Sequence, residues 1–147
     1  MFIVSACLLG RKCRWNGLKY PAEKRFLYLP GVIPVCPEQL GGLATPREPA
    51  QIINGNGFDV LSDRARVINS AGIDVTMEFV AGAREVLKIA RQNKINRAVL
   101  KERSPSCAVH YLYQGKALIS GMGVTSALLL SEDFDVLSSE EIDKLYA

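Results

Sequence analysis

Three segments of this chain begin as short apolar runs and end on a cysteine. They are Phe2 to Cys7 (FIVSAC), Val32 to Cys36 (VIPVC) and Ala98 to Cys107 (AVLKERSPSC). Such runs are typical of strands covered on both faces, and Ser104-Pro105 stops the last one because proline has no backbone N–H to donate. In open α/β sheets, ligands bind beyond the carboxyl ends of the strands. The sequence therefore predicts a site lined by thiols at that edge.

The cysteines favour metal binding or chemistry over a disulfide framework. The chain has four, Cys7, Cys13, Cys36 and Cys107, and a reducing compartment disfavours disulfides. One alone would be interpreted as an inert core residue, but three of the four follow strands. No close C-x-x-C pair of the kind usual in structural zinc sites is present. Thiolates from distant loops suit zinc or an iron–sulfur cluster, and composition leaves both open.

The composition predicts one compact domain over residues 1–147. Hydrophobic residues make up 48% and charged residues 22% of the chain, which is enough for a real core. The first residues are apolar without a preceding basic region, so we expect neither a signal peptide nor a membrane-spanning helix. A net charge of +3 without lysine or arginine runs gives no strong nucleic-acid signal. We expect a cytoplasmic protein with no membrane partner. The sequence leaves its oligomeric state open.

Apolar residues repeat at spacings of three and four from Thr76 to Asn93, which indicates the longest amphipathic helix. This helix leads into the strand at Ala98. Strand, helix and parallel strand in succession indicate right-handed crossovers, and therefore an α/β fold with a doubly wound, mainly parallel sheet.

Shorter elements follow from local signals, and Gly41 to Pro49 is expected to form a loop that walls a pocket. The others are a strand at Phe2 to Ala6, a short helix at Pro21 to Tyr28, a possible Asn-Gly hairpin within Gln51 to Leu61, a hairpin or arm at Val109 to Ile119, a helix from Gly121 to Leu130, a strand at Asp135 to Leu137 and a closing helix capped by Ser138 with Glu141. Gly121 and Gly123 either serve a turn or, with Thr125, present donors to an anion.

Charged residues near the cysteines have more than one interpretation. Four cations, Arg11, Arg14, Lys101 and Arg103, would offset the negative charge of thiolates. Glu38, two residues after Cys36, is either a carboxylate favoured by the dipole of a helix starting at Pro37 or an acid–base group. His110, the single histidine, is interpreted as a surface or strand residue rather than a ligand.

Several motifs together resemble the domain-of-unknown-function family numbered 523. They are SACLLGRKCRWNG (5–17), CPEQLGGLATPREP (36–49), GIDVTMEFVAGA (72–83), LKERSPSCA (100–108) and GMGVTSALL (121–129). The resemblance implies a single-domain, Rossmann-like three-layer fold. In the characterised branch it implies thiouracil desulfurases that hold a [4Fe-4S] cluster by three cysteines. These positions fall on Cys7, Cys36 and Cys107, with Cys13 as the alternative ligand.

The resemblance also implies a reaction, the non-redox removal of sulfur from a small thiolated nucleobase or thioamide. The substrate sulfur would bind the open iron, Glu38 would move protons for an attacking water, and Ser104 would position substrate or water. The alternative is a zinc- or cluster-stabilised small-molecule binding module without catalysis.

Two positions depart from the family pattern. Asn16 stands where the family usually has aspartate, so an amide that cannot titrate replaces an acid. Ala108 stands where glycine commonly follows the last cysteine. We expect cluster binding to survive both.

Overall fold

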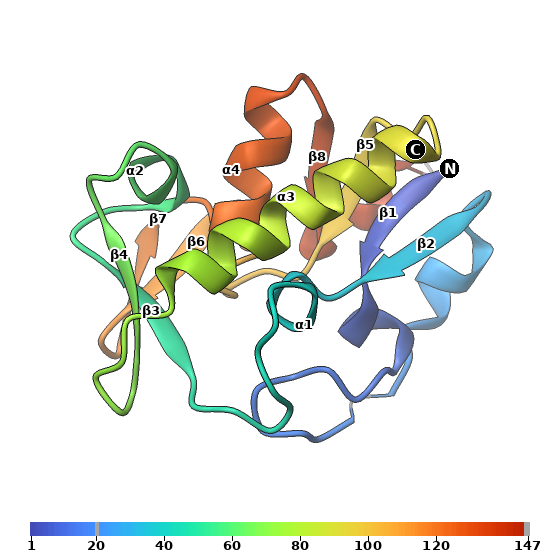
Figure 1. Ribbon diagram of the computed structural model, residues 1–147. Helices are drawn as coiled ribbons and strands as arrows, with labels where there is room; N and C mark the ends of the chain where they lie inside the picture. Colours follow the sequence, from blue (N-terminus) through green and yellow to red (C-terminus); the bar gives the residue numbers. More distant parts are fainter. Residues whose placement is uncertain (20, 146–147) are drawn as a thin grey trace.

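The computed structural model describes residues 1–19 and 21–145, and its centre is a parallel sheet of four strands (Figure 1). The strand order is β2-β1-β5-β8, with β1 at Phe2–Ser5, β2 at Val32–Val35, β5 at Arg97–Leu100 and β8 at Asp135–Ser138. Ile3 of β1 lies opposite Ile33 on one side and Ala98 on the other. The predicted α/β fold with a mainly parallel sheet is confirmed.

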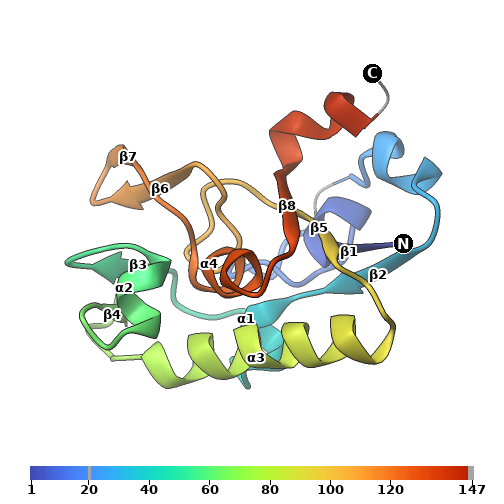
Figure 2. The ribbon, with the colours of Figure 1, turned by 90° about the horizontal axis from the view of Figure 1, so that it is seen from above.

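Helical segments cover both faces of this sheet and give three layers (Figure 2). One face carries α1 (Pro37–Leu40), α3 (Thr76–Gln92) and α4 (Val124–Ser131), and the other carries the 3-10 helices η1 (Ala6–Leu9), η2 (Lys24–Tyr28) and η3 (Ser139–Leu145). Alternate strand residues pack to opposite sides: Ile3 joins the core under α3 and α4, whereas Phe2 and Val4 join the core that contains Phe26 and Ile142. The short helices predicted at Pro21 to Tyr28 and at the end of the chain are 3-10 helices, η2 and η3.

Helix α3 ends one residue before the predicted boundary at Asn93. Its buried stripe includes Phe79, Ala83, Val86 and Ala90, which is the spacing that the sequence predicted. At its start the backbone N–H of Thr76 donates to Asp74 Oδ1 at 2.9 Å. None of the helices among the described residues has both the length and the apolar character needed to cross a membrane.

Two small antiparallel sheets stand beside the main sheet. One pairs β3 (Ala50–Ile53) with β4 (Arg66–Asn69), and the other is the hairpin of β6 (Tyr111–Gln114) and β7 (Ala117–Ser120), which confirms the hairpin predicted after Cys107. The prediction of an Asn-Gly hairpin within Gln51 to Leu61 is wrong, because a helix follows β3 there. The Oδ1 atom of Asn56 accepts from the N–H groups of Phe58 and Asp59, and this cap starts α2 (Gly57–Leu61) before the chain returns as β4.

Candidate metal centre

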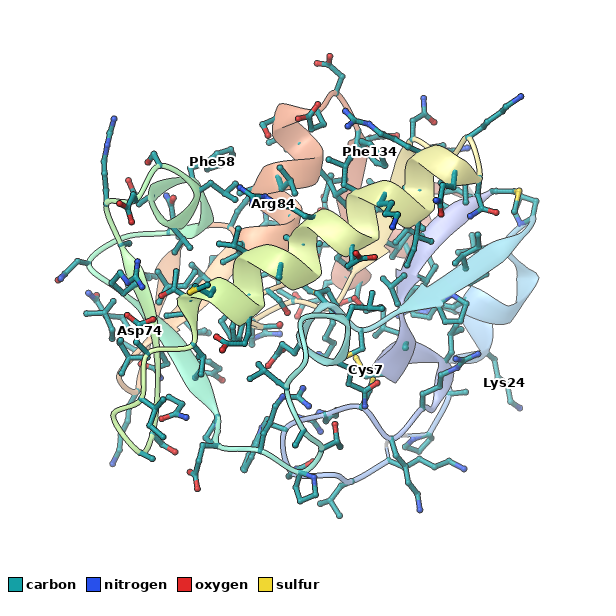
Figure 3. All side chains as sticks on the ribbon, in the orientation of Figure 1. Cys7, Lys24, Phe58, Asp74, Arg84 and Phe134 are labelled. Carbon is teal, nitrogen blue, oxygen red and sulfur yellow. The ribbon has the colours of Figure 1, made fainter. Side chains whose placement is uncertain are left out.

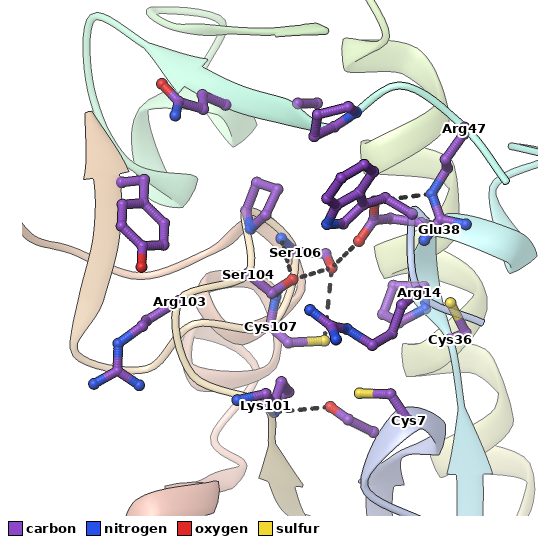
Figure 4. Close-up of a pocket in the computed structure, with 18 of the residues that line it drawn as sticks. Cys7, Arg14, Cys36, Glu38, Arg47, Lys101, Arg103, Ser104, Ser106 and Cys107 are labelled. Atoms are coloured by element: carbon purple, nitrogen blue, oxygen red, sulfur yellow. Dashed lines mark hydrogen bonds and ion pairs between the residues drawn. The ribbon is translucent and has the colours of Figure 1, made fainter. Parts of the chain in front are cut away.

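The carboxyl end of the main sheet opens into a pocket of about 640 Å³ that all four cysteines line. Cys36 follows β2, Cys7 follows β1 within η1, and Cys107 lies in the loop after β5. Because these strands are neighbours, their thiols meet at one edge, as predicted (Figure 4). Cys13 reaches the same pocket from the coil after η1. Figure 3 shows Cys7 near the middle of the molecule, away from Lys24 and Phe58.

Cys13 interacts with the thiols of Cys7 and Cys36, and burial acts on Cys13, Cys36 and Cys107. The Cys36 thiol lowers the pKa of Cys13, but a hydrogen bond with the Cys7 thiol and burial outweigh this and raise that pKa to about 11. The hydrogen bond with Cys13, together with burial, raises the pKa of Cys36 far above its usual value. Burial raises the pKa of Cys107 to about 12. Cys13, Cys36 and Cys107 therefore keep their protons at pH 7, and metal binding must displace them.

The turn that carries Cys107 is held by the start of α4. The backbone N–H groups of Val124 and Thr125 donate to the carbonyl oxygens of Pro105 and Ser106 at 2.9 and 2.8 Å. Gly123 is required at this contact, since a Cβ atom there would lie 2.5 Å from the Ser106 carbonyl carbon. The backbone N–H groups of Gly121, Gly123 and Thr125 all donate to carbonyl oxygens within the protein, so these donors are not free for an anion and the turn alternative holds for them.

A buried carboxylate fixes the other side of the same loop. Glu102 is 2% exposed, and its Oε1 accepts hydrogen bonds from the backbone N–H groups of Val109, His110 and Tyr111 at 2.9 to 3.0 Å. Its Oε2 accepts from the Ser138 hydroxyl at 2.5 Å. Burial acts to raise the pKa of Glu102, but these hydrogen bonds outweigh it and lower the pKa overall.

Glu38 faces the pocket from the first turn of α1 and is held at both carboxylate oxygens. Arg47 Nε donates to Oε1 at 3.2 Å, and the Ser106 hydroxyl donates to Oε2 at 3.1 Å. Arg47 also donates to the carbonyl oxygen of Cys13 at 2.8 Å and to Thr45 Oγ1 at 2.9 Å. The Glu38 side chain is 16% exposed and that of Arg47 is 8% exposed. This carboxylate therefore belongs to the site and makes more than a helix-dipole contact.

The other predicted residues divide between the pocket and its surroundings. Ser104 lines the pocket, and so do Arg14, Lys101 and Arg103, although Arg103 pairs with Glu140. Arg11 is exposed and is not part of the pocket wall, so it does not offset thiolate charge there. His110 is exposed, as predicted, and its Nε2 atom lies 2.6 Å from Glu141 Oε1. The loop from Gly41 to Pro49 does wall the pocket, through Arg47 and Pro49.

Sequence reasoning missed Ser106, Arg47 and Glu102. Ser106 and Arg47 belong to two of the family motifs, in the segments SPSC and TPREP, but no spacing rule connects either residue to Glu38. The two departures from the family pattern lie away from the pocket wall. Asn16 Oδ1 accepts from the Leu18 N–H at 3.0 Å in a local turn, and Ala108 is fully buried in the core. Aspartate at position 16 would accept the same hydrogen bond.

The donor set fits an iron–sulfur cluster better than a single ion. Among the described residues, no three histidine, cysteine, aspartate or glutamate side chains converge closely enough to hold one metal ion. A [4Fe-4S] cluster is bound through separate iron atoms, so its thiolates stand farther apart. The four cysteines around the pocket fit such a cluster, with the cations of Arg14 and Lys101 on the same wall.

Comparisons with known proteins agree with this geometry. A sequence model of the family described as 2-thiouracil desulfurase matches residues 2–141. The uncharacterised protein YbbK of Bacillus subtilis (strain 168) is 40% identical over 150 residues, which span 99% of each chain. The solved structure of the [4Fe-4S]-dependent thiouracil desulfidase TudS has a TM-score of 0.85 at 36% identity, covering 99% of this chain and 94% of that chain. The chain belongs to the 2-thiouracil desulfurase family.

Proposed function

We propose that the protein removes sulfur from a small thiolated nucleobase such as 2-thiouracil, without net redox change. The observation that carries the proposal is that thiols following three adjacent strands line one pocket together with Glu38. The similarity to TudS, whose name states a [4Fe-4S] cluster and thiouracil, supports the same cofactor and substrate class here. We place the reaction in the cytoplasm, where thiol ligands stay reduced.

The proposed ligands are Cys7, Cys36 and Cys107. Each follows a strand of the main sheet: Cys7 and Cys36 lie within two residues of a strand end, and the loop that carries Cys107 is held by α4 and Glu102. Cys13 lies between Cys7 and Cys36 on a coil and remains the alternative ligand. Three protein ligands leave one iron of a four-iron cluster open, and when bound the cluster supplies a Lewis acid for the substrate sulfur.

The overall reaction replaces a C=S group by a C=O group. Water adds its oxygen to the ring carbon, the C–S bond breaks, and sulfur leaves as sulfide, so that both water hydrogens end on product atoms or on sulfide. No electron donor or acceptor is needed. The protein must accept a proton from the attacking water and return one to a leaving or ring atom.

Glu38 is the proposed acid–base residue. It is a carboxylate that lines the pocket, and it holds a fixed orientation between Arg47 and Ser106. A positioned carboxylate of this kind contributes about 100- to 10,000-fold in rate. Ser104 is the second proposed functional residue, and its hydroxyl helps to position the groups around Glu38.

Anaerobic reconstitution tests the proposal. The protein is loaded with iron and sulfide, its metal content and visible absorption are recorded, and 2-thiouracil is added while uracil and sulfide are measured. We expect a brown protein with about four irons per chain and stoichiometric release of uracil and sulfide. A loaded protein that binds thiouracil without forming uracil would instead be a binding module, and a colourless protein that retains zinc would exclude the cluster.

A further inference from the structure

We infer that Ser106 is the positioning residue of the site: its hydroxyl fixes the carboxylate of Glu38, and Ser104 acts through Ser106 rather than on the substrate. The inference rests on the proposed function. It concerns two serines that stand two residues apart in the same motif but differ in how their hydrogen bonds are used. Figure 4 shows both hydroxyls and the carboxylate in one hydrogen-bonded line.

The acceptor capacity of Ser104 is already used by the backbone. Its Oγ accepts hydrogen bonds from the N–H groups of Ser106 and Cys107, both at 3.2 Å. A serine hydroxyl has two acceptor sites and one hydrogen. Only the hydroxyl hydrogen of Ser104 remains to form a hydrogen bond, and Ser106 Oγ lies 2.9 Å from Ser104 Oγ. Ser104 therefore donates to Ser106, which sets the direction of the chain.

The single hydroxyl hydrogen of Ser106 then has two possible acceptors. Glu38 Oε2 lies at 3.1 Å and Cys107 Sγ at 3.6 Å. The carboxylate is nearer and charged, and hydrogen bonds to ionised acceptors are about twice as strong as neutral ones. Ser106 is 1% exposed, so bulk water does not compete for this hydrogen. Ser106 therefore donates to Glu38.

The opposite oxygen of Glu38 is held by Arg47 Nε at 3.2 Å. With one partner on each oxygen, the carboxylate cannot rotate without breaking a hydrogen bond. A misplacement of roughly 1 Å in an active site costs on the order of 100-fold in rate. Loss of the Ser106 hydroxyl is therefore expected to lower kcat by about 10- to 100-fold, with little change in KM because this hydroxyl is buried and bonds to Glu38.

The experiment compares Ser106→Ala, Ser104→Ala, the double variant and Ser139→Ala in cluster-loaded protein. Ser139 is a matched control, because it is a buried serine outside the pocket whose Oγ accepts from the Glu102 N–H at 3.2 Å. Cluster content is measured for each variant, and kcat and KM are measured with 2-thiouracil. We expect the double variant to be no slower than Ser106→Ala, because the two residues act in series. If Ser104 contacts the substrate directly, the two losses multiply, and the inference is overturned.

A second readout does not depend on turnover. The carboxylate stretch of Glu38 is identified by infrared difference spectroscopy as the band that Glu38→Gln removes. It is expected to shift in Ser106→Ala and to stay in place in Ser139→Ala, and an unshifted band in Ser106→Ala overturns the contact. A loaded wild-type protein that forms no uracil overturns the proposed function and with it this inference. Normal wild-type turnover with an unchanged Ser106→Ala kcat overturns the inference alone.

Discussion

Gly82 of α3 lies against the carbonyl oxygen of Pro37 at the start of α1, so closely that a Cβ atom at position 82 would be 1.9 Å from it. The contact is reciprocal, because a Cβ atom at Gly41 would lie 1.9 Å from the carbonyl oxygen of Glu78. Two helices approach this closely only where both present glycine. Since α1 carries Glu38 and directly follows Cys36, this contact sets how both residues stand over the pocket.

Gly82→Ala is expected to push α1 away from α3. Alanine normally stabilises a helix interior by about 0.5 to 1 kcal/mol relative to glycine, but overpacking here is expected to cost about 1 to 3 kcal/mol. Chemical denaturation measures the change in the free energy of unfolding, and iron analysis measures the expected loss of cluster. Arg84→Ala on the exposed side of α3 is the control and should stay within about 0.5 kcal/mol of wild type. A more stable Gly82→Ala protein would contradict the contact.

Replacing Cys7, Cys36 or Cys107 by serine is expected to lower the iron content strongly, because each removes one of the three proposed ligands, which follow adjacent strands of the main sheet. Cys13→Ser should retain more cluster, since the coil that carries Cys13 follows η1 and not a strand of the main sheet. Iron and sulfide analysis after anaerobic reconstitution decides between these outcomes. Loss of the cluster in Cys13→Ser with retention in Cys7→Ser would show that the ligand assignment is wrong.

Glu38→Gln is expected to bind a normal amount of cluster and to turn over 2-thiouracil about 100- to 10,000-fold more slowly. The amide keeps the shape of the side chain but cannot carry a proton. A role limited to the helix dipole would cost only about 0.3 to 1 kcal/mol of stability and no activity. Glu48→Gln is the control, because Glu48 is an exposed carboxylate of the neighbouring loop that bonds Ser70. Near-wild-type turnover by Glu38→Gln would remove Glu38 from the mechanism.

Local sequence patterns predicted the four strands of the main sheet, the long helix and the thiol edge, because burial periodicity and strand ends are properties of neighbouring residues. The meeting of Glu38 with Ser106 joins residues 68 positions apart, and it depends on the path of the loop that α4 and Glu102 shape. No single-sequence pattern encodes such a path. The wrong hairpin at Asn54-Gly55 has a different cause, since the cap formed by Asn56 outweighed the turn signal beside it.

Glu102→Gln is expected to loosen the loop that carries Cys107. The neutral side chain weakens three backbone N–H hydrogen bonds to a buried charge, and the loss is expected to be on the order of 3 kcal/mol. Chemical denaturation measures it, and amide hydrogen exchange should accelerate at Val109, His110 and Tyr111. Glu140→Gln, which removes only an exposed pair with Arg103, is the control and should cost less than about 1 kcal/mol. Equal losses in the two variants would contradict the role given to Glu102.

The metal-free protein is expected to lose stability as the pH rises above 9. Burial raises the pKa of Cys107 from 9.0 to about 12, so in this range the unfolded chain has released a proton that the folded chain retains. The unfolded state is then favoured, and the contribution of Cys107 disappears progressively as the pH rises from 9 towards 12. Urea unfolding of metal-free protein between pH 8 and about 11 measures the slope. Cys107→Ala lacks the titrating thiol and should show a shallower decline, whereas identical slopes would mean that the thiol is not desolvated in solution.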